Sequence, residues 1–299
     1  MEKSILSIVI PAYNEEGSLP SYLPEVVDHC SQKGYTLIIV NDGSKDTTLS
    51  ICEAFSVQNS FIKVISHKVN RGYGGAIKSG VLAANSKYVI TIDADGQHNL
   101  SDVDSLLEAI SSADADMVVG DRGNKDASVY RGIGKRLIRS FARFLIPMKV
   151  RDINSGMKIY RTDLGQAYQH LCPNGMSYSD TILLVFINFR HLVLEKPITI
   201  NKRISGTSTI STMTAFQTIK EIVNIVMLFN PLKIFIPLAL LTFLAAVAWG
   251  IPIVLRGDGI SVGTMLGVLT SMLFIAIGFI AEQIAQIRLG SIRQKNQAK

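Results

Sequence analysis

Short apolar runs alternate with stretches of helical length over the first 120 residues of the chain. Five runs rich in valine and isoleucine are bounded by turn residues, a pattern typical of strands buried in a parallel sheet. They are Ile5–Ile10, Thr36–Val40, Phe61–Ser66, Tyr88–Ile92 and Met117–Val119. The alternation predicts βαβ units, and therefore an α/β fold with an open, mostly parallel sheet and flanking helices.

The last quarter of the chain contains two long runs without a charged residue, Ile234–Leu255 and Ile260–Ala281. Each exceeds the roughly 20 residues that a helix needs to cross a bilayer. The polar turn Arg256–Gly259 separates them, and Trp249 suits a position at a membrane interface. These runs predict a C-terminal hairpin of two transmembrane helices.

Basic residues give the expected orientation of the hairpin. Lys233 precedes the first run, and Arg288, Arg293, Lys295 and Lys299 follow the second. The positive-inside rule places both ends of the hairpin in the cytoplasm. The first residues lack the long apolar stretch of a secretory signal. We therefore expect a multi-pass protein of the cell (inner or plasma) membrane, with its N-terminal domain and both termini in the cytoplasm.

The expected organisation has four parts: a cytoplasmic catalytic domain (1–210), an amphipathic interfacial helix (211–232), the transmembrane hairpin (233–287) and a basic cytoplasmic tail (288–299). The second part rests on apolar residues spaced three and four apart between Met213 and Phe229. Such a helix lies either on the membrane surface or against the soluble domain, and the spacing favours neither.

The net charge of +6 fits nucleic acid or an anionic membrane surface as partner. The two predicted spans favour the lipid bilayer and argue against nucleic acid. Arg131, Lys135, Arg139 and Arg143 recur every four residues and form one stripe of a helix. The stripe is either a solvated face or, as we prefer, a surface that binds anionic headgroups. The three cysteines form no CxxC pair, so no zinc site is indicated.

Polar clusters follow three of the predicted strands: Pro11–Glu16, Asn41–Ser44 and Asp93–Gln97. Each alone is compatible with a turn or a helix cap. Ligands of open α/β sheets bind at the carboxyl ends of the strands, so three clusters there indicate one site. Asp93 and Asp95 would repel each other unless a hard cation bound them. They predict Mg²⁺ or Mn²⁺, with Gln97 as a further oxygen ligand. A solvated acidic turn is the alternative.

The ordered set of motifs resembles glycosyltransferase family 2, and within it the polyprenyl-phosphate glycosyltransferases. The resemblance covers about residues 4–210, and the two-span tail fits the bacterial branch. It rests on Pro11–Glu15, Asn41–Ser44, Asn70–Gly74, Asp93–His98 and Asp152–Gly156. It implies a GT-A fold. A dinucleotide site at Gly72–Gly75 is rejected, because Ile77 occupies the third glycine position.

The resemblance also implies roles. The nucleotide-sugar would contact Pro11, Tyr13, Glu15, Asp42, Asp93, Ala94, Asp95 and Arg122. The metal would lie at Asp93, Asp95 and Gln97. The acceptor phosphate would contact Arg131, Ser155, Lys158 and Arg203, and the catalytic residues would be Asp93, Asp95, Arg131 and Arg203. Two positions depart from the family pattern: Lys158 replaces an expected Arg, and Thr209 an expected Lys. The Ser/Thr-rich stretch Thr207–Thr212 is a candidate lid.

The implied reaction is metal-dependent, inverting transfer of a hexose from a nucleotide-sugar to undecaprenyl or dolichyl phosphate. UDP-glucose and GDP-mannose are the favoured donors, UDP-N-acetylhexosamines stay open, and a homo-oligomer is left open. A processive polysaccharide synthase would need a Gln-x-x-Arg-Trp motif, whereas the only tryptophan, Trp249, lies in a predicted span. The sequence also leaves open a nucleotidyltransferase and a non-catalytic membrane scaffold that binds nucleotide-sugar.

Overall fold

The computed structural model describes residues 4–123, 150–153, 155–201, 223–224 and 226–297, with side chains as far as Gly290. The chain forms two compact units, an α/β unit and a helical hairpin. The predicted residues Arg131 and Arg203, the basic stripe, most of the predicted interfacial helix and the candidate lid lie outside the described residues.

The α/β unit is built on a seven-stranded sheet in the order β3-β2-β1-β4-β6-β5-β7. Among the described strands, only β6 runs antiparallel to its neighbours, which are β4 and β5. The strands are β1 (Leu6–Ala12), β2 (Thr36–Asn41), β3 (Ile62–Ser66), β4 (Tyr88–Thr91), β5 (Met117–Asp121), β6 (Lys158–Arg161) and β7 (Val193–Pro197). The mostly parallel α/β class and the five predicted strands are confirmed. The last two strands were not predicted.

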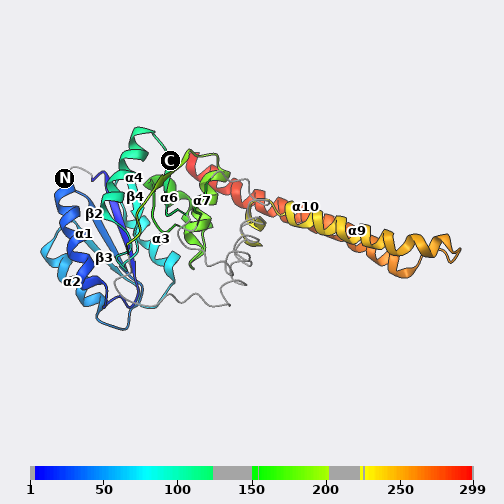
Figure 1. Ribbon diagram of the computed structural model, residues 1–299, viewed down its shortest axis with the longest axis horizontal. Helices are drawn as coiled ribbons and strands as arrows, with labels where there is room; N and C mark the ends of the chain where they lie inside the picture. Colours follow the sequence, from blue (N-terminus) through cyan, green and yellow to red (C-terminus); the bar gives the residue numbers. More distant parts are fainter. Residues whose placement is uncertain (1–3, 124–149, 154, 202–222, 225, 298–299) are drawn as a thin grey trace. The chain divides into compact units, whose positions relative to one another are not determined.

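Helices cover both faces of this sheet (Figure 1). They are α1 (Leu19–Lys33), α2 (Thr48–Gln58), α3 (Tyr73–Ala83), α4 (Leu100–Ser112), α6 (Thr162–Tyr168) and α7 (Tyr178–Asn188), with the short 3₁₀ turn η1 (Gln169–Leu171) after α6. Side chains alternate between the faces, as strand geometry requires. Leu6, Ile8 and Ile10 pack into the core with α1 and α4. Val9 points the other way, toward α3.

The parallel register brings the residues that follow β1, β2 and β3 to one edge. Asp42, directly after β2, donates its N–H to the carbonyl of Ala12 at the end of β1, at 2.8 Å. His67, directly after β3, donates its N–H to Asn41 at the end of β2, at 2.9 Å. The fold therefore places the residues after these strands side by side.

The hairpin consists of α9 (Leu232–Leu255) and α10 (Val262–Gln297). Both are long and apolar enough to cross a membrane by length and composition. α10 continues beyond the predicted end at Ala281, because Glu282 and Arg288 do not interrupt a helix. Little of either apolar stretch is buried, so large side chains such as Leu255 and Val262 are exposed, 81% and 72% respectively. A water-exposed surface of this kind is rare, whereas a lipid-facing one is expected.

Small residues bring the two helices of the hairpin together. A Cβ added at Gly267 would lie 2.6 Å from Ala246 Cβ, and one at Gly250 would lie 2.6 Å from Thr264 Cγ2. Close approach at glycine and alanine is the usual packing of helices in lipid.

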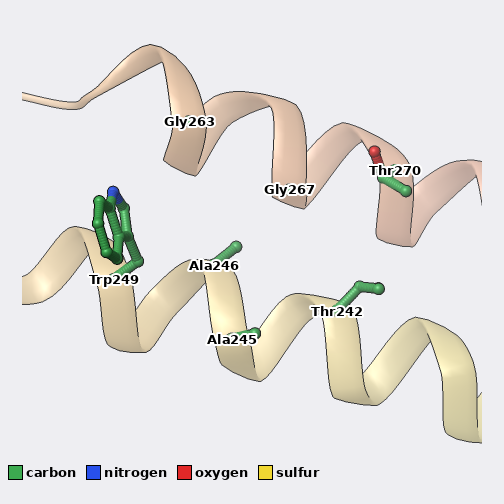
Figure 2. A pocket seen from close by; sticks show the side chains of 7 residues that line it. All are labelled: Thr242, Ala245, Ala246, Trp249, Gly263, Gly267 and Thr270. Atoms are coloured by element: carbon green, nitrogen blue, oxygen red, sulfur yellow. The ribbon is translucent and has the colours of Figure 1, made fainter.

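A groove of about 380 Å³ lies between the two helices. Figure 2 shows the residues that line it, which are Thr242, Ala245, Ala246, Trp249, Gly263, Gly267 and Thr270. This lining contains no charged side chain, so the groove does not supply the charges that phosphate chemistry needs.

Gly80 tests the packing of α3 on the sheet. Its added Cβ would lie 2.4 Å from Val9 Cγ1. Gly80→Ala should lower the free energy of unfolding of the α/β unit by roughly 1–3 kcal/mol through overpacking. Helix propensity alone would raise it by about 1 kcal/mol. Urea unfolding of the full chain in detergent measures the change. Gly175→Ala, which meets nothing within 4 Å, is the control, and equal stability of the two variants would contradict the packing.

Candidate active site

The loops after β1 and β2 are joined to each other by hydrogen bonds. The N–H of Asn14 donates to Ser44 Oγ at 3.0 Å, and Asn14 Oδ1 accepts from the N–H of Lys45 at 2.9 Å. Asn14 has a φ of 54°, a left-handed conformation that asparagine adopts more readily than most residues. Tyr13, just before this bend, is 42% exposed. An aromatic ring is therefore presented to solvent at the end of β1.

Pro11 and Glu15 border the same loops. Pro11 lies opposite Val40 in the β1–β2 register. The N–H of Glu15 donates to Thr48 Oγ1 at 2.8 Å, and the Glu15 carboxylate accepts from Ser18 Oγ. The structure thus brings together the predicted nucleotide-binding residues that follow β1 and β2.

Asp42 lies behind these loops and is 3% exposed. Its Oδ1 accepts from the N–H of Arg71 at 2.9 Å and lies 2.6 Å from His67 Nδ1. Its Oδ2 accepts from the N–H of Gly72 at 2.8 Å. The carboxylate therefore joins the end of β2 to the loop before α3. The left-handed φ of 88° at Gly72 and its contact with the Asn174 carbonyl require glycine there.

Asp93 follows β4 and is held from three directions. Its Oδ1 accepts from Tyr73 Oη at 2.9 Å, and its Oδ2 lies 3.3 Å from His98 Nε2. A Cβ added at Gly156 would lie 2.9 Å from Oδ2, so a larger residue there would push this carboxylate aside. Burial favours a raised pKa for Asp93, but the hydrogen bonds from His98 and Tyr73 outweigh it, and the pKa lies below the usual value. Asp93 is therefore ionised at neutral pH.

Asp95 lies on the same turn, 7% exposed, and its Oδ1 accepts from the N–H of Gln97 at 3.1 Å. Ala94 between the two acids is buried at 3% exposure. The described residues contain no group of three His, Cys, Asp or Glu side chains able to enclose a metal. Two carboxylates and one amide oxygen fit a hard divalent cation that also takes ligands from substrate phosphates and water.

Lys158 lies inside the fold, at the start of β6, and is 1% exposed. Its Nζ donates to the carbonyls of Ile153, at 3.0 Å, and Ser155, and to Ser179 Oγ at 2.6 Å. These bonds use all three ammonium hydrogens, and burial lowers the pKa of Lys158 to about 8. Ser155 is also buried. Both residues were predicted to bind acceptor phosphate. In the structure their side chains bond instead to the carbonyls of Ile153, Ser155 and Met157, in the loop before β6.

Arg122 and Asp152 form a two-pronged ion pair. Arg122 Nε and Nη2 donate to Asp152 Oδ2 and Oδ1 at 2.7 and 2.9 Å. The ion pair raises the pKa of Arg122. Burial favours a raised pKa for Asp152, but Arg122 outweighs it and the pKa is lowered. Arg122 was predicted to bind nucleotide-sugar phosphate. In the structure its side chain is paired with Asp152.

Several residues of the site were not singled out from the sequence. Tyr73 and His98 lay within quoted motifs but received no role, and His67 was not considered. His67 directly follows a strand, so the rule that found Asp42 and Asp93 would also have found it. Tyr73 opens a helix, and its bond to Asp93 spans 20 residues of sequence, so the local pattern gives no sign of it.

An acidic turn and hydrogen-bonded loops lie at the carboxyl edge of a mostly parallel sheet, where open α/β folds bind their ligands. The model of glycosyl transferase family 2 matches residues 7–167. Since this is more than half of the chain, the chain belongs to glycosyl transferase family 2. The model of the GtrB C-terminal hairpin matches residues 230–287. The resemblance identified from the sequence is therefore confirmed for both units.

Curated relatives have related names. The chain is 30% identical over 174 residues to a dolichyl-phosphate beta-glucosyltransferase of Dictyostelium discoideum, covering 52% of this chain and 53% of that protein. It is 28% identical over 215 residues to a polyprenol monophosphomannose synthase of Mycolicibacterium smegmatis, covering 68% and 80%. The chain thus spans about half the length of the first of these relatives.

A solved structure supports the fold. The glucosyl-3-phosphoglycerate synthase of Mycobacterium tuberculosis, solved with Mn²⁺, UDP-glucose and phosphoglyceric acid, superposes with a TM-score of 0.56 at 20% identity. The match covers 75% of this chain and 80% of that one. At this identity the likeness concerns the fold alone, and it agrees with the predicted GT-A class.

The Arg122–Asp152 pair makes stability depend on pH. The pKa of Asp152 is lowered from 3.8 by folding, so the stabilisation is present above about 3.8 and is lost as pH falls through the folded value. Asp152→Asn should lower the free energy of unfolding by about 1 kcal/mol at pH 7, since Arg122 is partly exposed. Urea unfolding of the wild type and of Asp152→Asn at pH 7 and pH 3 measures this change. The difference in free energy of unfolding between the two proteins should be smaller at pH 3.

Asp163→Asn is the matched control for this measurement. Asp163 also pairs with an arginine, Arg161, but its side chain is 62% exposed, against 16% for Asp152. Its removal should change stability less at pH 7. A difference for Asp152→Asn that persists unchanged at pH 3 would contradict the role of the ionised pair.

Proposed function

We propose that this chain transfers a hexose from a nucleotide-sugar to polyprenyl phosphate, giving a lipid-phosphate-linked sugar. One observation carries the proposal: the ionised Asp93, with Asp95 on the same turn, lies at the strand-end edge of a family 2 unit. The same chain continues into a hairpin that matches the GtrB C-terminal hairpin model. A charged site on a chain with two apolar helices suits a soluble donor and a lipid acceptor.

The donor would bind along the edge formed by the loops after β1, β2 and β4. Pro11, Tyr13, Glu15 and Asp42 would bind the base and ribose. Arg122 would contact the phosphates after exchanging its bond to Asp152. The two relatives carry different sugars in their names, glucose and mannose. UDP-glucose and GDP-mannose are therefore the proposed donors.

Asp93, Asp95 and Gln97 would hold Mg²⁺ or Mn²⁺, which when bound neutralises charge on the leaving nucleoside diphosphate. Tyr73 and His98 fix the two oxygens of Asp93. Their hydrogen bonds keep this carboxylate ionised and hold it against Gly156. The geometry of the acidic turn is thus set before substrate arrives, which lowers the reorganisation needed during transfer.

The acceptor phosphate needs little chemical activation. A phosphate monoester has its second pKa near 6, so it is mostly a dianion at pH 7 and is itself the nucleophile. Arg131 and Arg203 are proposed to align it with the anomeric carbon. A single displacement inverts that carbon, so an α-linked donor gives a β-linked product.

The membrane arrangement is proposed from the charges around the hairpin. Lys233 lies near the start of α9, and Arg288 lies near the end of the apolar stretch of α10. The positive-inside rule places both in the cytoplasm, together with the α/β unit and both termini. The donor site would then face the nucleotide-sugars of the cytoplasm.

An assay of lipid-linked product tests the function. Full-length protein in detergent is incubated with polyprenyl phosphate, Mg²⁺ or Mn²⁺ and a panel of nucleotide-sugars, and products are identified by mass. A hexosyl lipid phosphate should form from UDP-glucose or GDP-mannose. Asp95→Asn should reduce its rate by about a hundredfold or more, as expected when a stabiliser of transition-state charge is removed.

Asp28→Asn, an exposed acid on α1, is the control and should retain full activity. Sugar polymer formed without a lipid phosphate would favour a polysaccharide synthase. Pyrophosphate released from a nucleoside triphosphate would favour a nucleotidyltransferase. Nucleotide binding without any product would favour a scaffold.

A further inference from the structure

A buried chain of hydrogen bonds runs from Asp42 through His67 to Ser79. His67 Nδ1 lies 2.6 Å from Asp42 Oδ1, and His67 Nε2 lies 2.8 Å from Ser79 Oγ. The side chains of His67 and Asp42 are each 4% exposed. The three residues come from the loop after β2, the loop after β3 and helix α3, so the chain crosses three segments of the α/β unit.

The order Asp–His–Ser is also that of a hydrolase triad, but the serine end does not suit a nucleophile. Ser79 lies within α3, and its Oγ donates to the Gly75 carbonyl of the same helix at 3.2 Å. While Oγ donates to this carbonyl, it can only accept from a protonated His67 Nε2, and when Nε2 carries no proton, Oγ donates to the ring instead. In both cases Ser79 is bonded within its own helix or to His67, so the functional end of the chain is Asp42.

The partners of His67 fix which way its ring donates. Asp42 as a carboxylate only accepts, so Nδ1 carries a proton and donates to Oδ1. If Nε2 is also protonated it donates to Ser79, and if it is not, the Ser79 hydroxyl turns and donates to it. In both forms of the ring the Nδ1–H bond to Asp42 is kept.

Asp42 has three donors among the described residues: His67 Nδ1, the N–H of Arg71 and the N–H of Gly72. A carboxylate has about four acceptor positions, and two of the three donors are on Oδ1. One position therefore remains, on Oδ2, and the other bonds fix its direction.

We propose that His67 is a positioning residue for the donor nucleotide. Held by Ser79, it orients the Asp42 carboxylate so that Oδ2 accepts one N–H of the base. This inference rests on the proposed function, in which Asp42 binds the base. Uracil and guanine both carry a ring N–H next to a carbonyl, whereas cytosine and adenine carry an unprotonated ring nitrogen there. UDP or GDP should accordingly bind more tightly than CDP or ADP.

Calorimetric binding of UDP, GDP, CDP and ADP to the full chain in detergent, with Mg²⁺, tests this role. Relative to wild type, His67→Ala should weaken binding of the preferred nucleotide about tenfold, which equals about 1.4 kcal/mol. His67→Asn should restore most of it, because its amide nitrogen takes the place of Nδ1. His67→Gln should not, because its amide nitrogen takes the place of Nε2.

Turnover separates positioning from a general loss of structure. In the transfer assay, His67→Ala should raise KM for the nucleotide-sugar about tenfold and leave kcat within about threefold, as expected for loss of binding energy. His191→Ala is the matched control. His191 is also a partly buried histidine paired with an aspartate, with Nδ1 3.2 Å from Asp116 Oδ2, but it lies outside the strand-end loops.

Three results would overturn the role of His67. They are unchanged nucleotide affinity in folded His67→Ala, equal weakening in His67→Asn and His67→Gln, or equal weakening in His191→Ala. If His67→Ala does not fold, the comparison of nucleotide affinity between His67→Asn and His67→Gln tests the role. Wild-type protein that binds no nucleotide would overturn the proposed function together with this inference. If the wild type transfers sugar and the His67 variants have unchanged nucleotide affinity and KM, the inference alone would be overturned.

Discussion

The contact between the Asp93 carboxylate and Gly156 is the constraint on which the site depends. Three segments meet at this carboxylate: the start of α3 through Tyr73, the turn after β4 through His98, and the loop before β6 through Gly156. The antiparallel strand β6 lies beside β4, which is how a loop about 60 residues away in sequence reaches Asp93. Lys158 then holds that loop from below by donating to its carbonyls. The buried lysine therefore supports the loop that lies against Asp93.

The sequence predicted the parts of the fold that follow from strong periodicity. Five strands and both apolar helices were found, because apolar runs of strand length and of membrane-spanning length are distinctive. β6 and β7 were missed since each has a short run that includes charged residues, Lys158 and Arg161 in one and Glu195 and Lys196 in the other. α10 extends past the predicted span because the prediction followed hydrophobicity, whereas a helix continues through charged residues as long as its backbone bonding continues.

The candidate site was predicted where position along a strand determines it. Asp42 and Asp93 follow strands, and the parallel register brings such residues to one edge. The burial of Lys158 was not predicted, because a charged side chain is usually exposed and its bonds to backbone carbonyls leave no trace in the sequence. His67 directly follows a strand and was overlooked, whereas the bond of Tyr73 to Asp93 joins distant segments and leaves no local pattern. Residue type therefore located the acids, while their hydrogen-bond partners came only from the three-dimensional structure.

The Arg122–Asp152 pair affects how much a change in the length of the chain between these two residues costs in stability. It joins the two ends of the 30-residue interval between them, and the N–H of Arg122 also reaches Asp152 Oδ2 at 3.2 Å. Chain inserted between two fixed, adjacent ends adds little entropic cost, about 0.6 kcal/mol for each doubling of length. Insertions in this interval should therefore cost little stability and leave the sheet and the acidic turn in place.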